Sequence, residues 1–299
     1  MFLKGIWIKV KIFLEMAAEK KRVALISVFA AVFLTVFKII VGILTGSLGI
    51  LSEALHSGLD LVAAIITYFS VRLSDKPADS DHRYGHGKIE NLSALIETFL
   101  LLITCVWIIY EAISRLLSGN THIEVNKWSY IVVISSIIID YNRSRMLFRV
   151  AKKHNSQALE ADAIHFSTDI WSSSVVLFGL VCVNFGWYFA DAVAALGVAS
   201  IVLFVSYQLG KRAIDVLLDK APMDTVAIVE QTLSNYPEVK QFHDLKVRTA
   251  GADTFIKFNI HLEPDLSLRQ VHELCDKIEN ELGELISRSE IYIHAEPQE

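Results

Sequence analysis

Residues 23–46 read VALISVFAAVFLTVFKIIVGILTG, an apolar run long enough to cross a lipid bilayer as a single helix. A crossing helix needs about 20 mostly apolar residues. A second run of the same character, DAVAALGVASIVLFVSYQLG, occupies residues 191–210. Only 53% of the 299 residues are hydrophobic, so we expect a membrane domain joined to a soluble part.

The sequence contains six candidate membrane spans. They cover residues 23–45, 49–73, 92–117, 127–148, 160–186 and 189–210. Several spans contain an ionisable residue, namely Lys38, Glu53, Glu97, Asp140 and Asp191. Such groups normally face a bundle interior or a water-filled cavity rather than lipid. The pattern therefore predicts an α-helical membrane protein with six transmembrane helices, of which the fourth is least regular because Asp140 and YNRSR shorten its apolar stretch.

The basic residues predict the orientation of this bundle. They gather in EKKR (19–22), in the connection at 72–88 and in YNRSRMLFRVAKKH (141–154), whereas the alternate connections carry few. The positive-inside rule places the basic segments and both termini in the cytoplasm. The leader, residues 1–22, alternates lysines with apolar residues and is typical of an amphipathic segment at the membrane surface, with no evident cleavable signal peptide.

The chain changes character after about residue 212. A linker with Pro222 precedes a short amphipathic helix at 224–237, for which Asp224 is the expected N-cap. Alternating segments at 239–251 and 253–264 predict a hairpin that turns at Gly251. A second helix at 267–286 and a last strand at 290–297 complete the order αββαβ. We expect domains at 1–22, 23–212 and 213–299, the last a cytoplasmic α+β domain.

Two short polar motifs lie inside apolar spans. HSGLD (56–60) and HFSTD (165–169) each place a histidine four residues before an aspartate, on one face of a helix. If the second and fifth spans pack together, four metal ligands converge: His56, Asp60, His165 and Asp169. Two imidazoles and two carboxylates suit a tetrahedral Zn²⁺, and the carboxylates neutralise its charge. Protons can replace the metal, because histidine titrates near physiological pH. A single such histidine is more often structural, but two motifs favour a metal site.

Two further groups of residues could bind metal. The connection after the second span holds Asp79, His82 and His86, although spacing alone favours a solvated polar loop. The tail holds four of the ten histidines and a nearby glutamate, namely His243, His261, His272, His294 and Glu296. Some of these could be merely exposed polar residues.

Composition excludes several functions. A net charge of −5 argues against a nucleic-acid partner. Three scattered cysteines indicate no disulfide framework, and no glycine-rich nucleotide loop indicates ATP use. Four protein ligands leave no open position on a catalytic zinc, so we expect no enzyme and no organic cofactor. With the family resemblance described below, a secondary transporter that exports Zn²⁺ is the favoured function, and a membrane metal sensor that reads zinc with its tail is the alternative.

The chain resembles the cation diffusion facilitator family over nearly its whole length. The resemblance lies in GSLGILSEALHSGLD (46–60), KPADSDHRYGHGKIENL (76–92) and NSQALEADAIHFSTDIWSS (155–173). It implies a homodimeric, six-span divalent-metal/proton antiporter with a metallochaperone-like cytoplasmic domain, placed by analogy in a bacterial cytoplasmic membrane. The four intramembrane ligands take the transport-site positions. Several broadly selective bacterial members carry aspartate where His56 stands, so histidine here favours Zn²⁺ over Mn²⁺ or Mg²⁺, with Cd²⁺, Fe²⁺ and Co²⁺ still open.

The resemblance also implies roles for the remaining candidates. The loop residues Asp79, His82 and His86 correspond to a loop metal site of the family. The tail histidines correspond to a binuclear zinc site near the dimer interface, where Glu296 replaces the aspartate of some members. Lys88 and Asp219 resemble a charge pair that joins the third and sixth spans near the cytoplasmic dimer contact.

Overall fold

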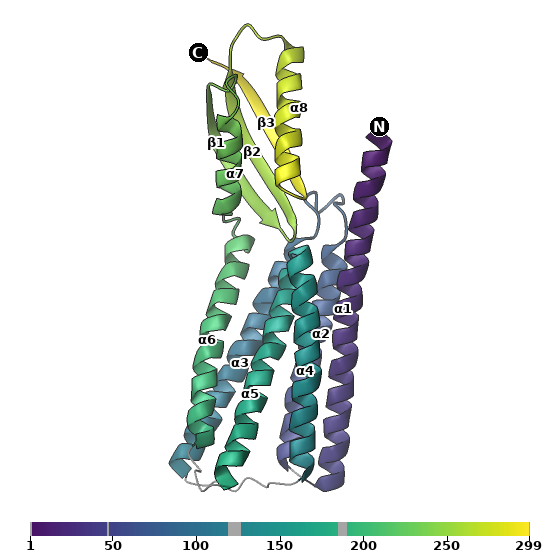
Figure 1. Ribbon diagram of the computed structural model, residues 1–299, viewed down its shortest axis with the longest axis vertical. Coiled ribbons are helices and arrows are strands. Elements are labelled where there is room, and N and C mark those ends of the chain that lie inside the picture. The colour runs from purple at the N-terminus through teal and green to yellow at the C-terminus, as the bar shows by residue number, and fades with distance from the viewer. Residues whose placement is uncertain (1, 47, 119–126, 185–189, 299) are drawn as a thin grey trace.

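Six long helices form a bundle, and a small α+β domain sits on one end of it (Figure 1). This computed structural model describes residues 2–46, 48–118, 127–184 and 190–298. The bundle helices are α1 (Phe2–Thr45), α2 (Leu48–Ser74), α3 (Lys88–Ser118), α4 (Lys127–His154), α5 (Gln157–Asn184) and α6 (Ala190–Leu217). The N-terminal end of α1 and the α+β domain lie at the same end of the bundle, as an even number of long antiparallel helices requires.

Four of these helices have the length and apolar composition of a membrane span among the residues that are described. They are α1 over Glu15–Thr45, α2 over Glu53–Ser74, α3 over Lys88–Ser114 and α6 over Val193–Leu217. The other two, α4 and α5, do not meet these criteria over the residues that are described, and the first half of α5, residues 157–170, has no exposed residue. Six membrane crossings therefore stay a prediction.

The leader is not a separate segment. Residues 2–22 continue without a break into the first span, and together they form the single 44-residue helix α1. The boundary predicted at residue 22 is therefore not a break in the helix, and the position of this amphipathic segment at the membrane surface stays a prediction. Lysines spaced through an apolar sequence do not interrupt helical geometry, because lysine is itself a good helix former.

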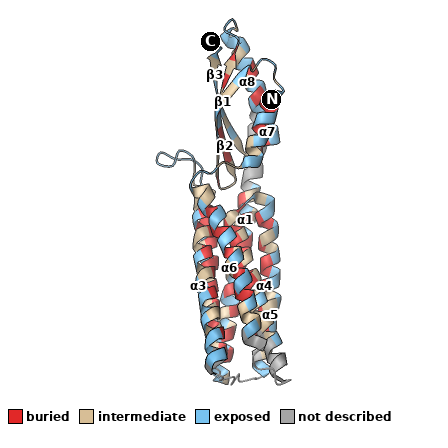
Figure 2. Cartoon of the chain, turned by 90° about the vertical axis from the view of Figure 1, so that its left-hand side faces the viewer, coloured by how far each residue is buried: buried red, intermediate tan, exposed pale blue. Residues whose placement is uncertain are grey.

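The outer surface of the bundle is apolar. Figure 2 shows buried residues on the inward sides of the helices and exposed residues on their outward sides. Large apolar side chains such as Phe29, Phe33 and Ile43 are exposed there, while Leu147, Leu159 and Phe166 form the interior. A helix bundle in lipid requires apolar side chains both in its interior and on its outer surface.

Four segments of the bundle meet in a buried ionic cluster at the end nearest the α+β domain. Lys20 of α1 donates to Asp75 at 2.6 Å and to Glu90 of α3 at 2.9 Å. Ser156, just before α5, donates to the other Glu90 oxygen. Because Lys20 is 2% exposed, removing it would leave two buried carboxylates without their cation.

The C-terminal domain has the predicted αββαβ order. It consists of α7 (Met223–Ser234), β1 (Gln241–Ala250), β2 (Asp253–Leu262), α8 (Leu268–Leu285) and β3 (Ser289–Pro297). β2 pairs antiparallel with β1 and parallel with β3. The hairpin turns at Gly251, whose φ of +61° suits glycine. The prediction of Asp224 as N-cap was wrong: α7 begins at Met223, Pro222 occupies the cap position, and Asp224 lies in the first turn.

Both helices of this domain cover the same face of the sheet. Ile256, Phe258 and Ile260 of β2 point into a core that includes Val229 of α7 and Ile278 of α8. Because side chains alternate along a strand, the residues between them lie on the opposite face. That face has no helix of this chain on it among the described elements.

Candidate metal centre

The two intramembrane motifs meet inside the bundle. His165 Nε2 of α5 lies 3.1 Å from Asp60 Oδ1 of α2. His56 Nε2 of α2 lies 3.5 Å from Asp169 Oδ1 of α5. Within each motif the histidine and aspartate are 3.9 Å apart on α2 and 3.7 Å apart on α5. His56, Asp60 and Asp169 have ligand atoms within 4.8 Å of one another, and His165 adjoins this group through its contacts with the two aspartates.

This site is largely shielded. The side chains of Asp60, His165 and Asp169 are nearly buried, whereas that of His56 is 32% exposed. The small residue Ser57 lies beside His56 and its carbonyl accepts a hydrogen bond from Thr35 of α1 at 2.9 Å. The donor set of two nitrogens and two carboxylates has the composition of a four-coordinate zinc site.

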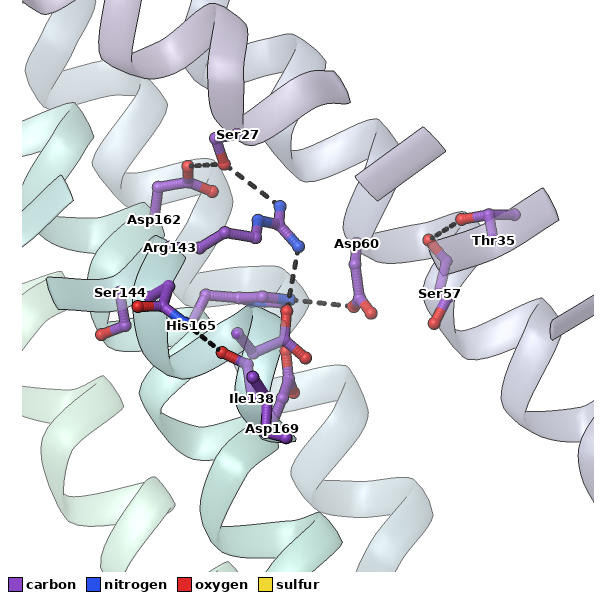
Figure 3. A network of polar contacts seen from close by, with 12 residues as sticks. Ser27, Thr35, Ser57, Asp60, Ile138, Arg143, Ser144, Asp162, His165 and Asp169 are labelled. Carbon is purple, nitrogen blue, oxygen red and sulfur yellow. Dashed lines mark hydrogen bonds and ion pairs between the residues drawn. The ribbon is translucent and has the colours of Figure 1, made fainter. Parts of the chain in front are cut away.

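A second polar layer lies against this site, and the sequence analysis did not foresee it (Figure 3). Arg143 of α4 donates to Asp140 at 3.0 Å and to Ser27 of α1 at 3.1 Å, and Ser27 donates to Asp162 of α5 at 3.2 Å. The sequence placed Arg143 in a basic cytoplasmic connection. The structure instead buries it within α4, at 3% exposure, where Asp140 and Ser27 accept its hydrogen bonds and Asp162 is linked to it through Ser27.

The loop candidates are also brought together. Asp79 Oδ1 lies 3.3 Å from His82 Nδ1, and Asp79 Oδ2 lies 3.4 Å from His86 Nε2. The His82 backbone N–H, and next that of Asp81, donate to Asp79 and hold the pKa of its carboxyl below the usual value. An ionised carboxylate beside two imidazoles forms an incomplete metal-ligand set at an exposed site.

Most of the tail candidates gather on the open face of the sheet. His243 of β1, His261 of β2 and Glu296 of β3 have ligand atoms within 4.8 Å of one another. His294 Nε2 lies 3.5 Å from Glu296 Oε1. Asn259, which the sequence analysis missed, donates to Glu296 at 3.1 Å. Its position two residues before His261 on a strand places it on the same face, which is the signal that could have found it.

His272 is not part of this group within one chain. It lies on α8, which covers the other face of the sheet, and its side chain is 73% exposed beside Asp276. The sequence and the family resemblance grouped it with the other tail histidines; within one chain the sheet separates them, and a role for His272 at the dimer interface stays a prediction.

The predicted charge pair is present as a contact. Lys88 Nζ, at the start of α3, lies 2.9 Å from Asp219 Oδ1, just after α6. Asp219 Oδ2 also lies 3.7 Å from Arg248 of β1, so the pair connects the bundle to the α+β domain.

These features define the class of the molecule: an integral membrane protein with a cluster of metal-ligand side chains between its helices and a soluble domain with a second cluster. Residues 24–218 match the family model of the cation efflux transmembrane domain, and residues 221–298 match that of the cation efflux protein cytoplasmic domain. The chain belongs to the cation diffusion facilitator family of cation efflux transporters. It is therefore a transporter rather than an enzyme, as predicted.

Individual relatives align along most of the chain. An uncharacterized transporter of Synechocystis sp. is 34% identical over 280 residues, which span 92% of this chain and 90% of the relative. The cation-efflux pump FieF of Shewanella oneidensis is 30% identical over 272 residues, 91% of this chain and 92% of the relative. The metal-bound C-terminal domain of the CzcD transporter from Thermotoga maritima is 29% identical over 25% of this chain and 88% of that one, with a TM-score of 0.25. The matched cytoplasmic domain supports a homodimer.

Proposed function

We propose that this protein exports Zn²⁺ from the cytoplasm in exchange for H⁺ by alternating access. The observation that carries the proposal is the convergence of four ligands from α2 and α5, namely His56, Asp60, His165 and Asp169. Two nitrogens and two carboxylates fit tetrahedral Zn²⁺ better than the octahedral oxygen sites of Mg²⁺. Cd²⁺, Fe²⁺ and Co²⁺ are the competitors that an assay has to include.

Charge balance supports exchange with protons. Asp60 and Asp169 neutralise a divalent ion inside a bundle of low dielectric constant. Without the metal the two carboxylates repel each other, and protons on His56 and His165 restore the balance across contacts of 3.1–3.9 Å. Metal binding requires neutral imidazoles, so it releases these protons.

The two remaining metal-ligand groups have proposed roles in regulation or delivery. The loop group (Asp79, His82, His86) lies in the α2–α3 connection, beside the charge pair at the start of α3. The sheet group (His243, His261, His294, Glu296) lies on the open face of the dimerisation domain, where bound metal could cross-link two domains. We propose that both bind metal in the cytoplasm of a bacterial inner-membrane protein. The common end of the N-terminus and the α+β domain supports this orientation.

The test of antiport is flux into proteoliposomes. We expect Zn²⁺ uptake by the reconstituted protein to accelerate several-fold when the lumen is acidic, because outward proton flow then drives inward metal flow. An ionophore that collapses the pH gradient is the control and should remove the acceleration. Uptake that ignores the gradient would refute antiport, and metal binding without any uptake would favour the sensor.

The sheet group makes a separate prediction. In full-length protein freed of metal and then equilibrated with Zn²⁺, His261→Ala should lower the metal bound per chain, because His261 shares one centre with His243 and Glu296. His154→Ala is the control and should bind as much metal as the wild type, since His154 pairs with Glu19 and belongs to none of the three metal-ligand groups. Equal losses in both variants would show that the loss does not come from the sheet group.

A further inference from the structure

Arg143 is a buried cation that the four-ligand site does not account for. A charged side chain inside a membrane bundle is costly unless it is paired, and such residues are usually functional. Arg143 is 3% exposed, lies on α4, and is not a metal ligand because arginine keeps its proton. Its presence beside a cation site is unexpected, since a fixed positive charge opposes the binding of a metal.

The contacts of Arg143 hold two acidic side chains. One guanidinium nitrogen donates to Asp140 at 3.0 Å, and another donates to Ser27, which itself donates to Asp162. The guanidinium carbon lies 3.5 Å from the centre of the Phe166 ring. A planar fork can make all of these contacts at once, whereas the single ammonium of lysine cannot.

The packing of α4 against α5 also places Asp140 at the level of the metal ligands. Asp140 lies one helical turn from Ser144, whose hydroxyl is 2.7 Å from that of Ser167, between His165 and Asp169 on α5. The Phe166 ring that stacks on Arg143 also contacts the ring of His165, with centroids 5.5 Å apart. Arg143 therefore packs against α5 at the level of the site and holds a third carboxylate, that of Asp140.

We propose that Arg143 is a specificity-determining residue that keeps Asp140 out of the coordination shell of the transported metal. The inference rests on the proposed function of the four-ligand site. With Asp140 held by the guanidinium, a metal meets two imidazoles and two carboxylates, which is a neutral four-coordinate site. With Asp140 released, the site gains a third carboxylate and becomes richer in oxygen.

The chemical consequence is a change in which cations bind. Oxygen-rich sites with more ligands favour harder ions such as Mn²⁺, whereas a site with two imidazoles favours Zn²⁺. A third carboxylate would also retain the metal longer, and transport requires binding weak enough for release. Arg143 therefore serves selectivity and turnover through Asp140 without touching the metal.

The experiment compares Zn²⁺ and Mn²⁺ uptake in proteoliposomes for the wild type, Arg143→Met and the double variant Asp140→Asn/Arg143→Met. We expect Arg143→Met to raise the ratio of Mn²⁺ to Zn²⁺ uptake about tenfold and to lower the KM for Mn²⁺. The double variant removes the carboxylate together with its cation, so the ratio should return to within about twofold of the wild type. Arg145→Met is the matched control, because Arg145 is exposed on the same helix.

Two results would overturn the proposal. One is an unchanged uptake ratio in Arg143→Met, and the other is a changed ratio that persists in the double variant, which would exclude Asp140 as the cause. If Arg143→Met does not fold, Arg143→Lys carries the test, with a smaller shift in the same direction. Asp169→Ala is measured alongside: normal Zn²⁺ uptake there would refute the four-ligand site, whereas its loss with an unchanged Arg143 ratio would refute this inference alone.

Discussion

Asp169→Ala should reduce Zn²⁺ flux about 100-fold or more. Asp169 lies 3.5 Å from His56 and 3.7 Å from His165, so it supplies one ligand and half of the negative charge that neutralises the metal. Leaving a buried charge without its partner costs about 3–5 kcal/mol. Each 1.4 kcal/mol is a factor of ten in binding. Uptake into proteoliposomes at matched protein density is the measurement, and Asp60→Ala should behave alike.

Two controls separate charge from shape in this test. Asp169→Asn keeps the volume and one oxygen ligand but removes the charge, so it should also lose most of its flux. Asp215→Ala removes an acid of α6 that pairs with the exposed Lys220, and flux should stay near that of the wild type. Wild-type flux in Asp169→Ala or Asp60→Ala would show that the metal crosses elsewhere.

The soluble domain was predictable because its signals are short-range. Alternation along residues 241–250 and 253–262 and a glycine at the turn identify the hairpin without knowledge of the rest of the chain. The capping box of Ser267 and Gln270 likewise marks the start of α8 locally. The prediction of Asp224 as the N-cap failed because Pro222, two residues earlier, already fixes the backbone at the helix start.

The convergence of the four candidate ligands inside the bundle was predictable for a related reason. The spacing of four residues defines one helix face, and only the pairing of α2 with α5 had to be assumed. Arg143 was not predictable in this way. Arg143 and the basic residues near it give this part of the sequence a low hydropathy, so it is read as a loop. The packing of α4 against α1 and α5 determines that Arg143 points inward while Arg145 is exposed.

The packing of the soluble domain also explains why the tail histidines do not all lie together. His243 and His261 lie on neighbouring strands, and strand alternation places both on the face that lacks helices. His272 lies on α8, which covers the opposite face of the sheet, and the spacing of the histidines in the sequence does not reveal this. Which histidines of one chain lie close enough to share a metal therefore depends on the side of the sheet they occupy, and the packing of the helices decides that side.

His56→Asp should change the selectivity of transport by about tenfold in favour of harder ions. His56 is the most exposed of the four ligands and the one at which a carboxylate can enter with least rearrangement. The substitution replaces a nitrogen by an oxygen and adds a negative charge, so the site gains affinity for Mn²⁺ and Fe²⁺ relative to Zn²⁺. Competition assays should show Zn²⁺ uptake inhibited more strongly by these ions in the variant than in the wild type.

The control for this prediction is His272→Asp, which makes the same chemical change at an exposed position outside every cluster of its own chain. It should leave competition unchanged. Selectivity that is identical in His56→Asp and the wild type would refute the argument from the imidazole. The double variant His56→Asp/Arg143→Met tests whether both residues act on one site. Both changes add a carboxylate to that site, so their combined effect on the Mn²⁺ to Zn²⁺ uptake ratio should differ from the product of the two single effects. Simple additivity would mean that Asp140 and His56 act on different metal ions.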